Sequence, residues 1–317
     1  MKINKFPIYP YLLFLLSLIF VISCNSKQQY SDTPTTGSIS IAVDETFKPI
    51  AQAEIDVFQA IYNSTSIKPS YDNENLAFKK LLNDSVRMII CSRKLYQFEK
   101  DIFEKKKFYP KEIKIATDAI ALIVNPSNKD TIISIDNLKD ILNGKITSWK
   151  QIYPTSKLGK ITLVFDNQNS STVHYLIDSV SKGDTLSNTL SALNINTDVI
   201  SYVSKNANAI GIIGTSFVSD RDDSTSLSFL NSIKVMSVSK EHIATYENSF
   251  KPYQAYIATK QYPLVRDIYI ILSEPRTGLA SGFTSFITSD RGQRIILKSG
   301  ILPATRPVRI INVNNEL

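Results

Sequence analysis

A strand that passes directly into a helix near the middle of the chain is the feature that most constrains its fold. Residues 161–165 form an apolar, β-branched run, and apolar side chains recur at helical spacing between residues 176 and 180. The turn between them contains four residues that favour helix N-caps: Asn169, Ser170, Ser171 and Thr172. Such a turn offers unpaired N–H groups and the positive end of the helix dipole, so it can hold an oxyanion. The alternative is an ordinary cap that binds nothing.

Strands and helices alternate in the N-terminal third of the chain. The apolar patterns predict strands at 38–43, 67–71 and 86–91, with helices between them at 50–62 and 76–82. This order favours an α/β fold with a right-handed, mainly parallel sheet. In such sheets the ligand crevice lies beyond the carboxyl ends of the strands, so we expect the loops that follow the three strands to converge.

Two further extended stretches, 119–124 and 264–272, enclose a middle block of ~130 residues, which favours an inserted second lobe joined to the first by two crossings. A cleft between two such lobes can close like a hinge. We therefore expect lobe I at 38–118 and 263–317, and lobe II at 119–262.

The N-terminal segment is typical of an exported protein. Lys2 and Lys5 precede an apolar run over 12–22, which is short for a membrane span. The run ends in Val-Ile-Ser-Cys, which resembles a bacterial lipobox and implies that Cys24 carries lipid once residues 1–23 are removed as a signal peptide. An uncleaved anchor helix is the alternative, and both predict an exported chain attached to a bacterial membrane. The polar residues 24–37 predict a flexible tether.

Charge and residue usage exclude several classes of function. Loss of the signal peptide leaves 34 basic against 29 acidic residues, a net charge of +5 that favours small anions. No stripe of Lys and Arg with interleaved aromatic residues indicates nucleic-acid binding. The chain has two His and two Cys, and with Cys24 assigned to lipid these provide neither a zinc site nor an internal disulfide. We expect a monomer with no metal and no cofactor.

The order of several short motifs resembles the PstS-type phosphate-binding proteins, substrate-binding lipoproteins of ABC importers. These motifs lie at 44–50, 118–121, 141–149, 170–172, 209–214, 262–266 and 292–303. The resemblance spans residues 38–305 and implies a two-lobe, type II periplasmic-binding fold with mixed sheets flanked by helices and two hinge crossings. It also implies that the chain is not an enzyme, and that it captures inorganic phosphate or a similar oxyanion for an ABC permease.

The resemblance also implies ligand contacts, residue by residue. The N–H groups and hydroxyl that hold phosphate after the first strand correspond to Thr46 and Phe47. A polar side chain from the second loop corresponds to Asn75 or Glu74. The second lobe adds the hydroxyl turn described above, with Ser170, Ser171 and Thr172.

Two charges depart from the family pattern. The best-known members have Asp after the third strand, where this chain has Arg93, and Arg before the hydroxyl turn, where it has Asp166. In one interpretation Arg93 is a bidentate cation for the anion and Asp166 accepts a proton from it. In the other, the two side chains pair across the cleft or point to solvent. The preference for phosphate over sulfate therefore rests on the resemblance and not on these side chains.

Two rival functions remain open. Ser170, His174 and Asp178 lie at i, i+4 and i+8, which suggests a serine hydrolase. Side chains spaced in this way stack along one helix instead of converging on a substrate carbonyl, so we expect no catalysis. The other rival is an interaction or signalling lipoprotein that kept the fold and lost the ligand, since the charges at 93 and 166 are exchanged.

Overall fold

The computed structural model describes residues 32–183, 187, 190–220 and 222–305. The predicted signal peptide and the lipidation site Cys24 lie outside these residues. Within the described ranges, none of the helices has the length and apolar character needed to cross a bilayer.

The N-terminal third folds as alternating strands and helices, as its sequence predicts. Its elements are β1 (Gly37–Asp44), α2 (Lys48–Ile61), β2 (Thr65–Asp72), α3 (Glu74–Leu82), β3 (Met88–Cys91) and α4 (Gln97–Lys105). Strand β1 pairs in parallel with both β2 and β3. The carboxyl ends of all three strands therefore lie at one edge of the sheet, as expected for parallel neighbours.

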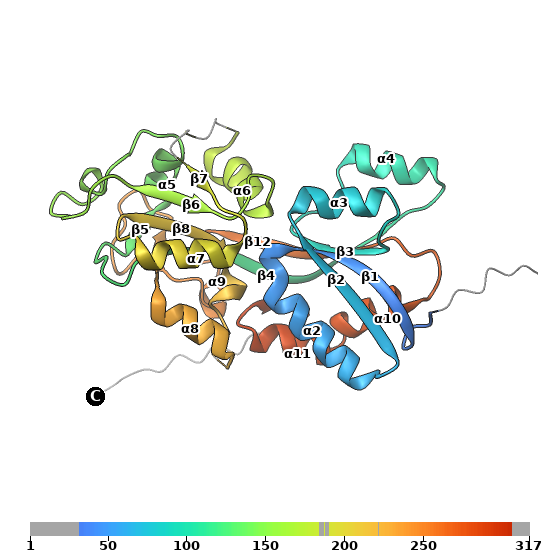
Figure 1. The fold of residues 1–317 in the computed structure, drawn as a ribbon. Coiled ribbons are helices and arrows are strands. Elements are labelled where there is room, and N and C mark those ends of the chain that lie inside the picture. The colour runs from blue at the N-terminus through green and yellow to red at the C-terminus, as the bar shows by residue number, and fades with distance from the viewer. Residues whose placement is uncertain (1–31, 184–186, 188–189, 221, 306–317) are drawn as a thin grey trace, which may run out of the picture. The chain divides into compact units, whose positions relative to one another are not determined.

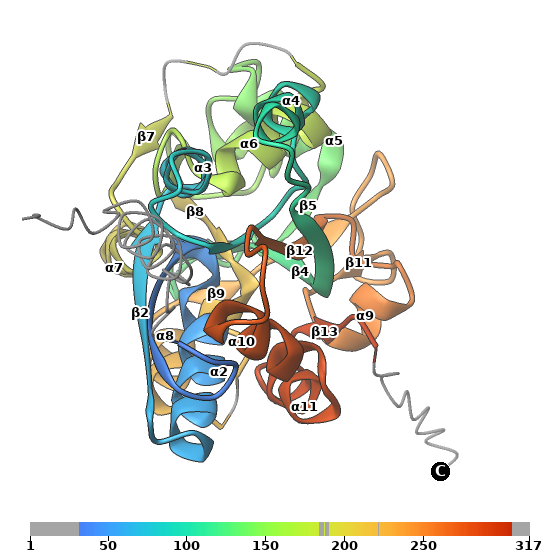
Figure 2. The same cartoon turned by 90° about the vertical axis from the view of Figure 1, so that its right-hand side faces the viewer.

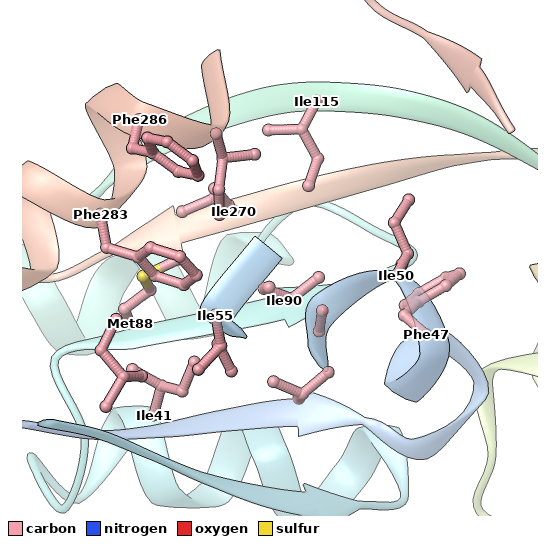
Figure 3. Packing of buried hydrophobic residues seen from close by; sticks show 14 of the residues in the cluster. Ile41, Phe47, Ile50, Ile55, Met88, Ile90, Ile115, Ile270, Phe283 and Phe286 are labelled. Carbon is pink, nitrogen blue, oxygen red and sulfur yellow. The ribbon is translucent and has the colours of Figure 1, made fainter. Parts of the chain in front are cut away.

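Helices α10 (Leu279–Thr288) and α11 (Asp290–Lys298) return from the C-terminal part of the chain to pack against α2 (Figure 2). Their apolar faces complete a core with β1 and β3, which Figure 3 shows around Met88, Ile55 and Phe283. The ring of Phe58 on α2 lies 5.1 Å from that of Phe283, in an edge-to-face arrangement that aromatic pairs prefer. Elements from the N-terminal and C-terminal parts of the described chain thus share one apolar core.

Two long strands pass from this lobe into the next (Figure 1). Strand β4 (Lys111–Val124) pairs antiparallel with β12 (Val265–Leu272), and β12 pairs antiparallel with β3. Beyond residue 119, β4 pairs with β8 (Ala209–Gly214) of the middle block. These are the two crossings that the sequence predicts. A mixed sheet runs through them in the order β2-β1-β3-β12-β4-β8, and it ends with β6 (Thr162–Phe165) and β7 (Ser191–Ala192).

The middle block consists of further strands of this sheet, a small three-stranded sheet and the helices that pack against them. Its helices are α5 (Ile135–Leu142), α6 (Ser171–Tyr175), α7 (Asn196–Lys205), α8 (Ser224–Ser232) and α9 (Gln254–Ala258). Its remaining strands are β5 (Ile132–Ser134), β6 (Thr162–Phe165), β7 (Ser191–Ala192), β9 (Lys234–Val235), β10 (Ser237–Ser239) and β11 (Ser249–Phe250). Strand β13 (Leu302–Pro303) ends the described chain against β4.

The buried apolar clusters divide the described chain near the crossings. Two clusters draw on residues 39–116 and 268–301, whereas the other two draw on residues 119–265. The predicted α/β class with two lobes is confirmed, while the lobe boundaries given above stay a prediction. We call the two parts lobe I and lobe II.

The prediction of a flexible tether needs correction at its C-terminal end. Asp32 is buried, and its carboxylate accepts the N–H of Leu279 at 2.8 Å and forms ion pairs with Arg87 and Arg276. Because Asp32 satisfies the first turn of α10, residues 32–36 are fixed to lobe I and β1 begins at Gly37. Composition alone misses this because one acidic residue among polar neighbours has no periodic pattern.

Candidate functional site

The end of β1 places a threonine hydroxyl and an aromatic ring beneath the second lobe. Asp44 Oδ1 accepts hydrogen bonds from the N–H of Thr46 at 3.1 Å and from its hydroxyl at 2.9 Å. This cap starts the short 3-10 helix η1 (Glu45–Phe47) and fixes the Thr46 rotamer. Thr46 and Phe47 are two of the predicted site residues, and both are fully buried. They lie where the lobes meet, since Thr46 is close to Ser171 of lobe II and Phe47 lies against Arg266, which contacts the same serine.

The strand-to-helix turn of lobe II faces this threonine. Ser170 caps α6, its Oγ accepting the N–H of Val173 at 3.3 Å and donating to Asp166 Oδ1 at 2.7 Å. Ser171 Oγ lies 3.5 Å from Thr46 Oγ1, across the junction. The Thr172 hydroxyl is buried and finds no hydrogen-bond partner among the described residues. A buried hydroxyl without a partner costs free energy, so a polar ligand at this point would satisfy it.

The cation next to the hydroxyl turn is Arg266 on β12. Its Nη1 donates to Ser171 Oγ at 2.8 Å, and its Nη2 and Nε donate to Asp118 Oδ2 at 3.1 and 3.3 Å. The guanidinium carbon lies 4.7 Å from the centre of the Phe47 ring. Arg266 was not among the predicted site residues, although charges inside two buried strands, at 118 and 266, are a signal for a buried ion pair.

The interpretation of Arg93 needs correction. Its guanidinium forms a two-pronged contact with Glu99, at 2.7 and 2.9 Å, and stacks on Phe78 and Tyr96. Glu74 lies 3.8 Å from its Nε. Arg93 therefore pairs within lobe I and not with Asp166, because the capping carboxylate of Glu99 at the start of α4 is closer.

Glu74 links the two lobes at the start of α3. Its Oε1 accepts the N–H of Ser92 at 3.2 Å and the Ser92 hydroxyl at 2.6 Å, while Oε2 lies 3.0 Å from His174 Nδ1 of lobe II. Burial opposes ionisation of Glu74, but the hydrogen bonds from His174 and Ser92 outweigh it and lower its pKa. The hydrogen bond to Glu74 raises the pKa of His174 in turn. Asn75 is exposed at the rim, where it donates to Asn169 at 3.4 Å.

A second acidic contact crosses the junction. Glu45 Oε2 accepts both the N–H of Asn196, at 3.2 Å, and its side-chain amide, at 2.5 Å. The same amide lies 3.3 Å from Asp166 Oδ2, and Asn196 Oδ1 accepts the N–H of Gly214 at 3.1 Å. Burial raises the pKa of Glu45 and of Asp166. Asn196 therefore bridges two buried carboxyls whose negative charges would otherwise repel each other.

A small cavity of about 70 Å³ opens beside these groups, lined by Asp44, Glu45, Asp166 and Ser170 with residues of β2 and of the 194–195 loop. A much larger hollow of about 690 Å³ lies elsewhere, between α9 and the end of α11. The small cavity is the relevant one because Asp44, which has an unpartnered carboxylate oxygen, and Ser170 of the hydroxyl turn both line it. In the described part of the chain, no group of three or more His, Cys, Asp or Glu side chains could hold a metal ion.

The hydrolase alternative is wrong. Ser170 Oγ is bound to Asp166, the His174 ring faces Glu74 of the other lobe, and Asp178 is exposed. The three side chains do not converge, because residues 176–181 continue α6 as a π-helix along the same axis.

A two-lobe α/β chain with hydroxyls and a cation facing each other across the junction is the arrangement of a solute-binding protein. A family model described as a PBP superfamily domain matches residues 28–291, so the chain belongs to the PBP superfamily. It is distantly homologous to the phosphate-binding protein PstS of Borreliella burgdorferi, at 26% identity over 91% of this chain and 98% of that one. A PstS protein of Staphylococcus aureus is 24% identical over 78% of this chain and 73% of its own length.

Solved structures show the same fold. One from Clostridium perfringens, described as a phosphate ABC transporter substrate-binding protein with bound phosphate, covers 85% of this chain and 100% of its own at a TM-score of 0.71 and 24% identity. A phosphate transport receptor from Vibrio cholerae covers 83% of this chain and 99% of its own at a TM-score of 0.61 and 20% identity. The predicted type II periplasmic-binding fold is confirmed. The expectation that the chain is not an enzyme agrees with relatives that are named for binding.

Proposed function

We propose that this chain captures inorganic phosphate, or a closely similar tetrahedral oxyanion, between its two lobes and delivers it to an ABC importer. The observation that carries the proposal is the convergence of Thr46, Ser171 and Arg266 from three segments on one buried point, beside the unpartnered hydroxyl of Thr172. Relatives over most of the chain are phosphate-binding proteins. Hydroxyls, N–H groups and one guanidinium suit an oxyanion because all of them can donate hydrogen bonds.

In the proposed complex both lobes hold the anion. From lobe I act the N–H of Phe47 and Thr46, whose hydroxyl and N–H donate to Asp44 in this structure and would turn to the anion on binding. The turn at 170–172 acts from lobe II. Arg266 supplies the positive charge, and Asn75 and Asp166 lie at the edge of the site. Arg93 keeps a place in the proposal only as a residue that orients Glu74 and the end of β3, because its donors already face Glu99.

We expect the lobes to close on the anion because the closed form has the higher affinity for it. The structure holds the lobes together through contacts that need no ligand, including Glu45 with Asn196 and Glu74 with His174. An anion that touches both lobes binds the closed form more tightly than the open form, and so shifts the equilibrium toward closure. The closed form is then the state that would dock on a membrane permease.

Export and lipid attachment at Cys24 belong to the same proposal. A carrier for a membrane importer works at the outer face of that membrane, where a lipid anchor would keep it close to the permease. The hydrogen bond and ion pairs of Asp32 fix the residues just before β1 to lobe I. This supports a lipid anchor that is joined to the folded chain through lobe I. Lobe II would then be free to move during capture.

The test is titration calorimetry of the mature chain with inorganic phosphate, in wild type and Thr172→Val. Removal of the Thr172 hydroxyl should weaken phosphate binding about tenfold, in keeping with ~1 to 1.5 kcal/mol for one hydrogen bond. Thr284→Val is the matched control, because the Thr284 hydroxyl bonds only within the core of lobe I, to Ala280 and Met88. It should leave the affinity unchanged.

If phosphate neither binds nor raises the melting temperature at millimolar concentration, the proposal fails. An interaction lipoprotein without a ligand would then be favoured, in line with the many carboxyls around the cavity. A ligand that binds only the folded state must raise stability, so the melting measurement decides between the two.

A further inference from the structure

The Asp44 carboxyl lies in the candidate site, and only one of its two oxygens accepts hydrogen bonds from the described residues. Oδ1 receives two hydrogen bonds from Thr46, whereas Oδ2 is buried and has no hydrogen-bond partner among the described residues. Asp44 also lines the small cavity beside the hydroxyl turn. Oδ2 is therefore a free, buried polar atom of lobe I that an anion in this cavity would meet.

Most of the ionisable groups near Asp44 are acidic, and each nearby cation already pairs with another carboxylate. Its own segment adds Glu45, and α3 adds Glu74, whose charge is balanced by His174. Asp166 after β6 lines the same cavity, as does Asp72 at the end of β2, whose charge is balanced by Lys80 at 2.7 Å. The facing cation is Arg266 on β12, and Asp118 on β4 already pairs with it. Acidic groups thus outnumber the cations that remain for a ligand.

An ionised Oδ2 would face the oxygens of a bound anion with no proton between them. Repulsion between two buried negative groups is strong because little water screens it. With a proton, the same atom becomes a hydrogen-bond donor and fits the other donors of the site. Burial and, after it, the Glu74 charge raise the pKa of the Asp44 carboxyl to about 7, while Arg266, the Ser171 hydroxyl and the Thr46 N–H act in the opposite direction.

We propose that Asp44 enters the loaded site as the neutral acid and donates from Oδ2 to an oxygen of the anion, so that capture takes up one proton from solvent. This inference rests on the proposed function. The proton moves from water to Oδ2, and no bond of the anion forms or breaks. Because the protein supplies this proton, the site does not require one from its ligand, and sulfate is accepted as well as phosphate at mildly acidic pH.

Sulfate is the sharper probe because its own charge stays constant between about pH 5 and pH 9, far above its last pKa. Titration calorimetry of the mature chain with sodium sulfate should give an affinity about tenfold lower at about pH 8 than at about pH 6. That ratio follows from the fraction of Asp44 that is protonated at each pH around a pKa of about 7. Repeating the titration in buffers of different ionisation heat should show uptake of about one proton at the higher pH.

Asp44→Asn is the matched variant, because its amide keeps Oδ1 for Thr46 and donates permanently in place of the acid. It should bind sulfate with little dependence on pH, and at about pH 8 more tightly than wild type. His174→Gln distinguishes titration of Asp44 from titration of His174, because it removes the imidazole that faces Glu74. That variant should keep most of the wild-type pH dependence.

Three results would overturn the inference: sulfate binding that does not vary with pH, loss of all anion binding in Asp44→Asn, or binding of phosphate without sulfate at about pH 6. Each of them leaves phosphate capture by the wild type intact. Failure of the proposed function looks different, because then neither anion binds the wild-type chain at any pH.

Discussion

Replacement of Gly214 by alanine should impair closure of the lobes without impairing their folding. Gly214 ends β8 in lobe II, where it faces Thr46 of lobe I. A Cβ on Gly214 would lie 2.4 Å from Thr46 Cγ2 and 3.0 Å from the Thr46 carbonyl oxygen. Thr46 cannot rotate away at no cost, because its hydroxyl is bound to Asp44. The overlap therefore falls on the junction and not within either lobe.

The magnitude follows from the cost of overpacking, ~1 to 3 kcal/mol for an added methyl group. Gly214 has φ −68° and ψ 138°, which alanine adopts without strain, so the open form should tolerate the change. The full cost then opposes closure, and phosphate affinity should fall about 5- to 150-fold. Titration calorimetry measures the affinity, and thermal melting without ligand measures folding, where we expect little change.

Gly211→Ala is the matched control, three residues earlier on the same strand. Its Cβ would lie 2.7 to 2.9 Å from Val203, Ile123 and Val199, all within lobe II. This variant should lower the melting temperature by several degrees and weaken phosphate binding less than Gly214→Ala does. The reasoning is refuted if Gly214→Ala binds phosphate as the wild type does, or if it lowers the melting temperature as much as Gly211→Ala.

Two further predictions concern buried charges. Arg266→Met should cost ~3 to 5 kcal/mol of unfolding free energy, because Asp118 is left as an unpaired buried acid, and Asp118→Asn on that background should recover part of the loss in urea unfolding. Burial without a partner raises the pKa of Glu54 to about 9, so its ionisation is suppressed in the folded chain. This contribution to stability is complete below the unfolded pKa of about 4.5 and declines as pH rises toward 9. Glu54→Gln should flatten that decline in melting temperature, and an unchanged profile would contradict the assignment.

Local patterns predicted most of the fold because each element carries its own signal. The strand β1 and the helix α2 follow directly from alternation and from apolar side chains at helical spacing, and the structure places their ends within two residues of the predicted 38–43 and 50–62. The short helix α9 was not predicted, because its five residues are too few to show a period. The helical spacing between residues 176 and 180 predicted a helix there, but not that residues 176–181 form a π-helix.

The part of the candidate site that could be predicted consists of hydroxyl residues that cap a helix directly after a strand. Thr46 and the hydroxyl turn reached the junction because caps at strand ends sit at the sheet edge. Charged side chains were harder, since a charge takes the nearest partner that the tertiary structure offers. Arg93 pairs with Glu99, six residues away in sequence. Arg266 pairs with Asp118, which lies on the neighbouring strand but far away in sequence.

A crystal structure of the mature chain grown with inorganic phosphate tests the central claim most directly. The account predicts one tetrahedral anion between the lobes, within hydrogen-bond distance of Thr46 Oγ1, Ser171 Oγ and Thr172 Oγ1. Closed lobes with only water between these hydroxyls, or phosphate bound on another surface alone, would contradict it.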